Sequence, residues 1–135
     1  TAFSYLETNV KENNSSVKPV MADALEICET FADGELDLIV SNPPYIKSAD
    51  RETLQRKVQL EPRLALDGGE DGCDFYREIV NRWSRKLKKG GALAFELGEN
   101  QADAVKALMT DKGFSDFKIS LDFGGVQRAI IGTLL

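Results

Sequence analysis

Residues 36–45 read Leu-Asp-Leu-Ile-Val-Ser-Asn-Pro-Pro-Tyr, and this stretch decides the fold. Its apolar run, Leu38–Val40, is rich in β-branched residues, which is typical of a strand buried on both faces of a parallel sheet. Asn42 interrupts the run. Pro43 and Pro44 then fix the backbone and lack N–H groups, so the chain must leave the sheet. Ligands of open α/β sheets bind beyond the carboxyl ends of the strands, and we therefore expect an α/β fold with a site at this turn.

The residues of the turn suit a substrate that carries an NH₂ group. An amide or amino nitrogen delocalises its lone pair, so it attacks an electrophilic carbon only when it is held and aimed. The side-chain oxygen of Asn42 and the carbonyl of Pro43 can each accept one N–H of such a group, and Tyr45 can stack on a flat substrate. The alternative is that Asn-Pro-Pro forms only a loop. The strand before it and the aromatic ring after it favour a site.

Three parts of the sequence resemble one family of enzymes. Residues 41–45 resemble the (D/N/S)PP(Y/F/W) signature of S-adenosylmethionine-dependent amino methyltransferases, which act on adenine N6, guanine N2, cytosine N4 or glutamine N5. Residues 61–66 and 68–77 resemble the EPxxAL and GGxDGxDxYR runs of the HemK/PrmC family, and the resemblance continues through Gly98 and Gln101. Enzymes of that family methylate the glutamine of the GGQ motif in peptide-chain release factors.

The resemblance implies a fold, a cofactor and a set of site residues. The fold is a Rossmann-like class I methyltransferase fold, the methyl donor is S-adenosylmethionine, and no metal is required. A release factor is the expected partner, through its GGQ loop. The expected site residues are Asn42, Pro43, Pro44 and Tyr45 for catalysis and substrate binding, Glu61, Pro62 and Arg63 at the substrate entrance, and Asp23 and Ala24, with Asn42, at the cofactor. Asp23 has an alternative role as a helix N-cap.

One part of that fold has no counterpart in the sequence. A cofactor-binding half begins with a strand and a glycine-rich turn resembling D-x-G-x-G-x-G, and residues 1–135 contain no such turn. We therefore expect the chain to be the C-terminal portion of a single methyltransferase domain that lacks its first two strands. The family's strand order is 3-2-1-4-5-7-6. Without its usual neighbours, the strand at 37–40 would be an exposed apolar edge, which favours self-association.

Composition and charge narrow the function further. The chain has no histidine, which excludes triads built on imidazole, and its net charge of −5 argues against a nucleic acid as the direct substrate. No run is long and apolar enough to span a membrane, so a cytoplasmic location is expected. Two alternatives stay open. One is a DNA or RNA amino methyltransferase acting on adenine N6 or guanine N2, and the other is a non-catalytic fragment.

Periodicity and turn residues predict the remaining elements. The helix that begins at Asp74 should bury Trp83 and expose the basic run at 82–89, and the first helix should carry Tyr5 and Leu6 on an apolar stripe. The last two strands should form an antiparallel hairpin. In chain order, these elements are a helix at 2–13, a strand at 17–21, a short helix after Asp23, a polar helix at 48–58, an amphipathic helix at 74–89, a strand at 92–97, a helix at 101–112, and strands at 116–122 and 129–134.

Overall fold

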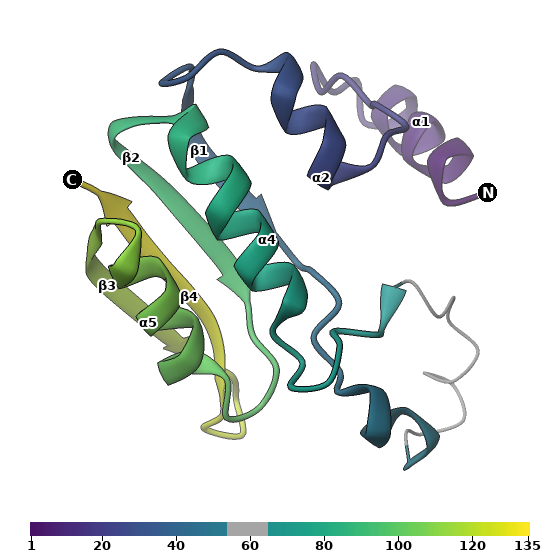
Figure 1. Ribbon diagram of the computed structural model, residues 1–135. Coiled ribbons are helices and arrows are strands. Elements are labelled where there is room, and N and C mark those ends of the chain that lie inside the picture. The colour runs from purple at the N-terminus through teal and green to yellow at the C-terminus, as the bar shows by residue number, and fades with distance from the viewer. Residues whose placement is uncertain (54–64) are drawn as a thin grey trace.

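A four-stranded sheet forms the centre of the computed structural model, which describes residues 1–53 and 65–135 (Figure 1). The strand order is β1-β2-β4-β3; β1 and β2 are parallel, and β4 is antiparallel to both of its neighbours. This is the order predicted for the last four strands, and the predicted terminal hairpin is confirmed. The strands are β1 (Leu36–Ser41), β2 (Leu87–Glu96), β3 (Phe114–Leu121) and β4 (Gln127–Leu134).

Two helices, α4 (Asp74–Trp83) and α5 (Ala102–Asp111), lie side by side on one face of this sheet (Figure 1). Their apolar residues recur at helical spacing, and burying that stripe against the sheet makes the core. The fully buried side chains of the core include Tyr76, Val80, Leu93, Phe95, Leu97, Val105, Met109 and Ile130. The shorter elements are α1 (Ala2–Glu12), α2 (Ala24–Ile27) and 3-10 turns at Cys28–Thr30, Ser48–Thr53 and Ser84–Lys86.

The strand β1 lies at the edge of the sheet, because β2 is its only partner strand among the described residues. Leu38 and Val40 are 54% and 69% exposed, so the prediction that this run is buried on both faces is wrong. The prediction of an exposed apolar edge is confirmed for the described part of the chain. Pairing of this edge with a second copy of the chain stays a prediction.

Residues 17–21 were expected to form a strand, and that expectation is wrong. The segment has no regular secondary structure, and Val17, Val20 and Met21 are all more than half exposed. A strand needs a neighbour to pair its backbone N–H and C=O groups, and no described strand lies beside this segment.

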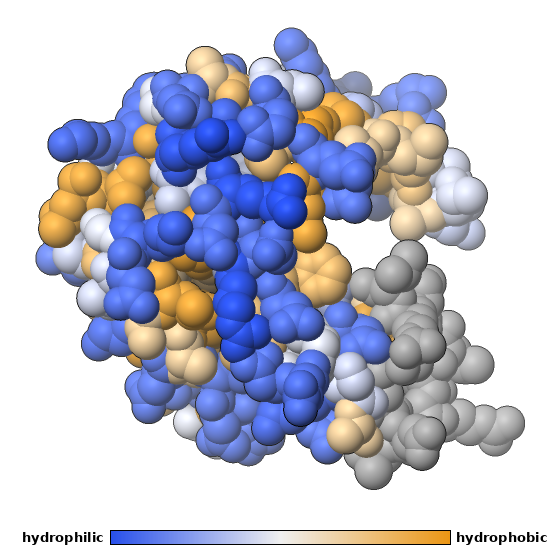
Figure 2. Space-filling view, in the orientation of Figure 1, coloured by the Kyte–Doolittle hydropathy of each residue, from blue (hydrophilic) through white to orange (hydrophobic). Residues whose placement is uncertain are grey.

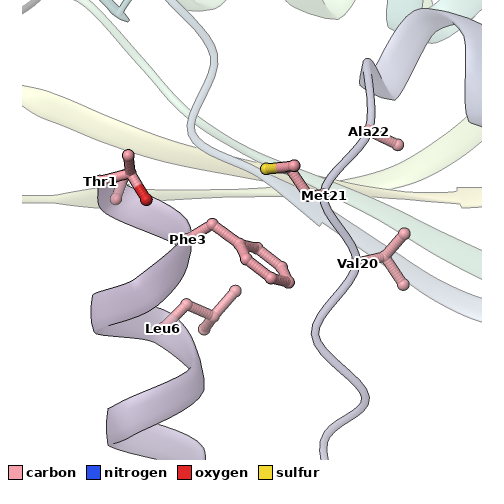
Figure 3. Close-up of a pocket in the computed structure, with 7 residues that line it drawn as sticks. Thr1, Phe3, Leu6, Val20, Met21 and Ala22 are labelled. Atoms are coloured by element: carbon pink, nitrogen blue, oxygen red, sulfur yellow. The ribbon is translucent and has the colours of Figure 1, made fainter.

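The helix at the N-terminus was placed correctly, but its apolar stripe is not part of the core. Tyr5 is 73% exposed and no residue of α1 is buried. Instead, Phe3 and Leu6 face Val20 and Met21 across an open apolar concavity of about 440 Å³ (Figure 3). This concavity contains no residue of the 42–45 turn.

The helix α4 ends earlier than predicted. Leu87 was expected to belong to it but begins β2, where it pairs with Leu36. Trp83 is half-buried and packs against the core as expected, and its indole N–H donates to the carbonyl of Ala24 at 2.8 Å. The basic run is not one solvated helical face, because Lys86 is buried and its ammonium group donates to Asp33 Oδ1 at 2.8 Å.

The helix predicted at 101–112 is confirmed as α5, and the polar helix predicted at 48–58 is seen as a 3-10 turn over Ser48–Thr53, beyond which it lies outside the described residues. No helix in the described part of the chain is both long and apolar enough to cross a bilayer. On the side of α4 and α5, the surface is mainly hydrophilic (Figure 2).

The contrast between the two faces of the sheet gives a matched pair of stability predictions. Replacing Leu93, which is fully buried, by Ala should lower the free energy of unfolding by about 2–5 kcal/mol, because it leaves a cavity. The same change at Leu38 should cost less than about 1 kcal/mol, since that side chain already contacts water. Urea denaturation of the two variants measures both values. Equal losses of unfolding free energy in the two variants would show that the exposed face of β1 is covered by another surface in solution.

Candidate functional site

The Asn42-to-Tyr45 turn leaves the sheet where β1 and β2 end together, since Ser41 pairs with Phe95 near the end of both strands. Pro43 is buried, Tyr45 is half-buried and Asn42 is exposed. Among the described residues, the side-chain amide of Asn42 has no hydrogen-bond partner. The turn therefore fixes its proline inside the molecule and presents a free amide at the carboxyl edge of the sheet.

A buried glutamine fixes the end of this turn. Gln101 precedes α5 and is 7% exposed. Its Nε2 donates to the carbonyls of Tyr45, at 2.9 Å, and Gly72, at 3.3 Å, while its Oε1 accepts from the Gly98 N–H at 3.0 Å. The hydroxyl of Tyr76 lies 3.2 Å from the same Oε1. We call these five residues the Gln101 cluster.

Glycines allow the backbone segments of this cluster to approach one another. A Cβ atom on Gly98 would lie 2.8 Å from Cδ2 of Tyr45, and one on Gly72 would lie 2.6 Å from the Tyr45 carbonyl oxygen. Gly68 is equally constrained, because its Cβ would lie 2.8 Å from the Tyr45 Cα. Gly72 also adopts a positive φ of 78°, which larger residues rarely tolerate. Only glycine fits at these positions without displacing the turn.

The loop over residues 65–73 lies directly against the turn. The N–H of Ile46 donates to Leu66 at 3.0 Å, the N–H of Gly68 donates back to Ile46 at 2.8 Å, and the N–H of Ser48 donates to Gly69 at 2.9 Å. The sequence resemblance placed Glu61, Pro62 and Arg63, which precede this loop in the chain, at the substrate entrance. The loop over residues 65–73 itself lies beside the 42–45 turn.

An ion pair closes that loop. Asp71 accepts hydrogen bonds from the guanidinium of Arg77 and from the N–H of Cys73, the latter at 2.9 Å. The Arg77 hydrogen bond, followed by that of Cys73, holds the pKa of the Asp71 carboxyl below its usual value. Asp71 thus joins the loop to the first turn of α4.

The aromatic rings around the turn make separate contacts. The hydroxyl of Tyr45 donates to Glu96 Oε1 at 3.3 Å, and that of Tyr76 donates to the Glu96 carbonyl at 2.8 Å. Glu96 is exposed. Burial raises the pKa of the Tyr76 hydroxyl, which therefore acts as a hydrogen-bond donor. Its ring meets that of Phe95 edge to face at 5.2 Å.

Asp23 and Ala24, the predicted cofactor neighbours, make no hydrogen bond to the 42–45 turn in the described part of the chain. Asp23 is the N-cap of α2: its Oδ1 accepts from the Leu25 N–H at 2.8 Å, as in the N-cap alternative. Ala24 accepts the indole hydrogen bond described above. The proposed entrance residues Glu61, Pro62 and Arg63 lie outside the described residues.

A polar cavity of about 420 Å³ adjoins the Gln101 cluster, and the sequence predicted no catalytic or binding role for the residues around it. Gln101 was part of the family resemblance, which was the only signal for it, whereas Gly98 also marked the end of a strand where the backbone was expected to come close to another group or turn sharply. Their role depends on contacts across 56 positions, between Tyr45 and Gln101, and no local pattern encodes such contacts. The cavity is lined by Lys47, Asp50, Asp71, Cys73, Glu99, Asn100, Gln101 and Ala104.

Known proteins resemble this chain over most of its length. A release factor glutamine methyltransferase of Geobacter sulfurreducens is 48% identical over 107 residues, which are 78% of this chain and 38% of the relative. Another, from Clostridium acetobutylicum, is 36% identical over 127 residues, which are 93% of this chain and 42% of the relative. The chain belongs to the release factor glutamine methyltransferase family. It spans about two fifths of the length of these relatives. No protein-family profile matches it.

Solved structures agree on the fold. A methyltransferase from Pyrococcus furiosus superposes with a TM-score of 0.67 at 22% identity, over 97% of this chain and 56% of that chain. A putative DNA modification methylase from Thermus thermophilus, complexed with S-adenosyl-L-methionine, gives a TM-score of 0.56 at 14% identity, over 84% of this chain and 54% of that chain. The predicted Rossmann-like class I methyltransferase fold is confirmed.

The ion pair of Asp71 predicts how stability depends on pH. The pKa of the Asp71 carboxyl is lowered in the folded state. The ion pair therefore contributes fully to the free energy of unfolding above the unfolded pKa, about 3.9, and this contribution is lost as the pH falls through the lower folded pKa. The Asp71→Asn variant should therefore be less stable than wild type at pH 7, and the difference should shrink below about pH 4. Urea denaturation at pH 7 and at pH 3 measures this difference.

The exposed neighbour Glu70 provides the control, because Glu70→Gln removes a carboxylate from the same loop without breaking the Arg77 contacts. If the loss of unfolding free energy in Asp71→Asn stayed constant from pH 7 to pH 3, the ion pair of Asp71 with Arg77 would not be its cause.

Proposed function

We propose that this chain forms the substrate-binding part of an S-adenosylmethionine-dependent methyltransferase that modifies the side-chain N5 of the glutamine in the GGQ motif of release factors. The observation that carries the proposal is the free amide of Asn42, held at the carboxyl edge of the sheet by a turn that is fixed at Tyr45. The curated relatives, which carry the name of this activity, support it.

The residues of the turn would hold the substrate amide. Two acceptors, Asn42 Oδ1 and the Pro43 carbonyl, suit the two N–H bonds of a glutamine side chain. Accepting both bonds favours a geometry in which the nitrogen lone pair points toward an electrophilic carbon. The ring of Tyr45 flanks the flat amide group. A strong base is not needed, because the nitrogen loses its proton after it has become cationic.

The methyl donor would be held in part by residues of this chain. S-adenosylmethionine supplies a methyl group on a positively charged sulfur, which leaves as a neutral thioether when the substrate nitrogen takes the methyl. Asp23 fits the amino group of the adenine: its Oδ1 caps α2, and its other carboxylate oxygen accepts no hydrogen bond from the described residues. Ala24 and Asn42 are the other proposed cofactor neighbours.

Recognition of the release factor would involve the segment beside the turn. Glu61, Pro62 and Arg63 are the proposed entrance residues on sequence grounds, and the described part of their loop lies against Ile46 and Ser48. A cytoplasmic location follows from such a partner. The alternative function, that of a DNA or RNA amino methyltransferase, would use the same turn to hold the amino group of a base.

A methyl-transfer assay tests the proposal. The chain is assayed alone and joined to the segment that the Geobacter sulfurreducens relative carries outside the matched region, with radiolabelled S-adenosylmethionine. The substrates are a release factor, the same factor with its GGQ glutamine changed to alanine, and duplex and single-stranded nucleic acids. Label on the first substrate alone is the expected result. Label on nucleic acid would favour the DNA or RNA amino methyltransferase, and no label on any substrate would favour a non-catalytic fragment.

Replacing Asn42 by Ala should lower the rate of methyl transfer and leave the stability of the fold nearly unchanged. The side chain is exposed, so its loss should change the free energy of unfolding by less than about 0.5 kcal/mol. Losing a hydrogen bond that aims the substrate nitrogen should lower kcat by about 100-fold. Asn81→Ala is the matched control, an exposed asparagine on α4, and should leave kcat unchanged. Equal kcat values for the two variants would contradict the role of Asn42.

A further inference from the structure

We propose that Gln101 is a positioning residue for methyl transfer: it holds the Tyr45 carbonyl in place and thereby sets the direction in which Asn42 presents its amide. This inference rests on the proposed function and adds to it a residue that touches neither substrate nor cofactor.

The side chain of Gln101 makes hydrogen bonds through both of its donors and through its oxygen. The two N–H groups of Nε2 meet the Tyr45 and Gly72 carbonyls, and Oε1 accepts from the Gly98 N–H, while the Tyr76 hydroxyl, which donates to the Glu96 carbonyl, lies 3.2 Å from the same Oε1. The opposite orientation of the amide would place Oε1 against two carbonyl oxygens and Nε2 against an N–H donor. The network therefore permits one orientation, and it fixes the geometry of all partners.

The position of Gln101 makes this network rigid. Gln101 is only 7% exposed, so water does not compete for the hydrogen bonds of its side chain. Its backbone N–H donates to the Gly98 carbonyl at 3.3 Å, and its carbonyl accepts from the Val105 N–H at 3.0 Å in the first turn of α5. The side chain is thus anchored to the end of β2 and to a helix packed on the core.

The turn transmits this anchoring to Asn42. Only Pro43 and Pro44 separate Asn42 from Tyr45, and both prolines have a fixed φ. Pro43 is also buried. Few torsion angles between the two groups can therefore absorb a shift of the Tyr45 carbonyl, and such a shift is passed on toward Asn42. Because misplacement by about 1 Å can lower a rate by about 100-fold, the loss of this anchor should reduce kcat strongly.

No other residue type reproduces the contacts. Glutamate has the same shape and can still accept from the Gly98 N–H, but its carboxylate has no donor for the Tyr45 and Gly72 carbonyls. Gln101→Glu is therefore the sharpest variant, since it changes donors into acceptors without changing size. The fully buried Val105, one turn along α5, provides the matched control: Val105→Ala weakens packing of the same helix and leaves the Gln101 cluster intact.

The test combines kinetics in the joined protein with hydrogen exchange in the chain itself. Gln101→Glu should lower kcat by about 100-fold with little change in the KM for the release factor. Its activity relative to wild type should rise as the pH is lowered, since a protonated carboxyl regains one donor. The amide protons of Ile46 and Gly68, which join the turn to its neighbouring loop, should exchange faster than in wild type. In Val105→Ala, kcat and these two exchange rates should stay close to wild type.

Two outcomes would overturn the inference. The first is a Gln101→Glu variant with wild-type kcat, and the second is unchanged exchange at Ile46 and Gly68. If the wild-type joined protein transfers no methyl group, the proposed function fails, and the exchange measurement still decides whether Gln101 holds the turn. If Gln101→Glu does not fold, Gln101→Asn, which retains both donors on a shorter side chain, should show the same faster exchange. Wild-type exchange in that variant would also overturn the inference.

Discussion

The buried amide of Gln101 joins the three segments that make the candidate site. Tyr45 follows β1, Gly72 precedes α4 and Gly98 follows β2, and each gives a backbone group to the same side chain. A buried carbonyl or N–H without a partner costs about 1–3 kcal/mol, so this one side chain satisfies groups that would otherwise destabilise the site. The glycines let the three backbones come close enough for one amide to reach all of them.

The arrangement explains how a site can persist at the edge of a sheet. β1 has one neighbouring strand among the described residues, and its outer face is exposed at Leu38 and Val40. The turn that follows β1 depends instead on β2, α5 and the loop at 65–73. Its geometry is therefore set mainly by the well-packed side of the molecule, where Leu93 and Phe95 are fully buried.

Much of this fold could be predicted from sequence because its signals are local. The helical spacing of apolar residues located α4 and α5, and the Asn-Pro-Pro-Tyr turn located the end of β1. The strand predicted at 17–21 failed because a strand is completed by its partners, which no local pattern supplies. The early end of α4 has a similar cause: Leu87 fits the helical period, yet it pairs with Leu36 in the sheet. The candidate site was predicted only in part for the same reason. Residues 42–45 carry a recognisable motif, whereas the role of Gln101 depends on a contact with Tyr45 that only the folded chain creates.

The turn is already ordered in this chain by contacts with the end of β2. The most direct test is an NMR measurement of nuclear Overhauser effects between the Tyr45 ring protons and the α protons of Gly98 in the isolated chain. Because a Cβ on Gly98 would lie only 2.8 Å from the ring, we expect strong cross-peaks. A Tyr45 ring that shows none, in a chain whose β2 and β4 are paired, would contradict it.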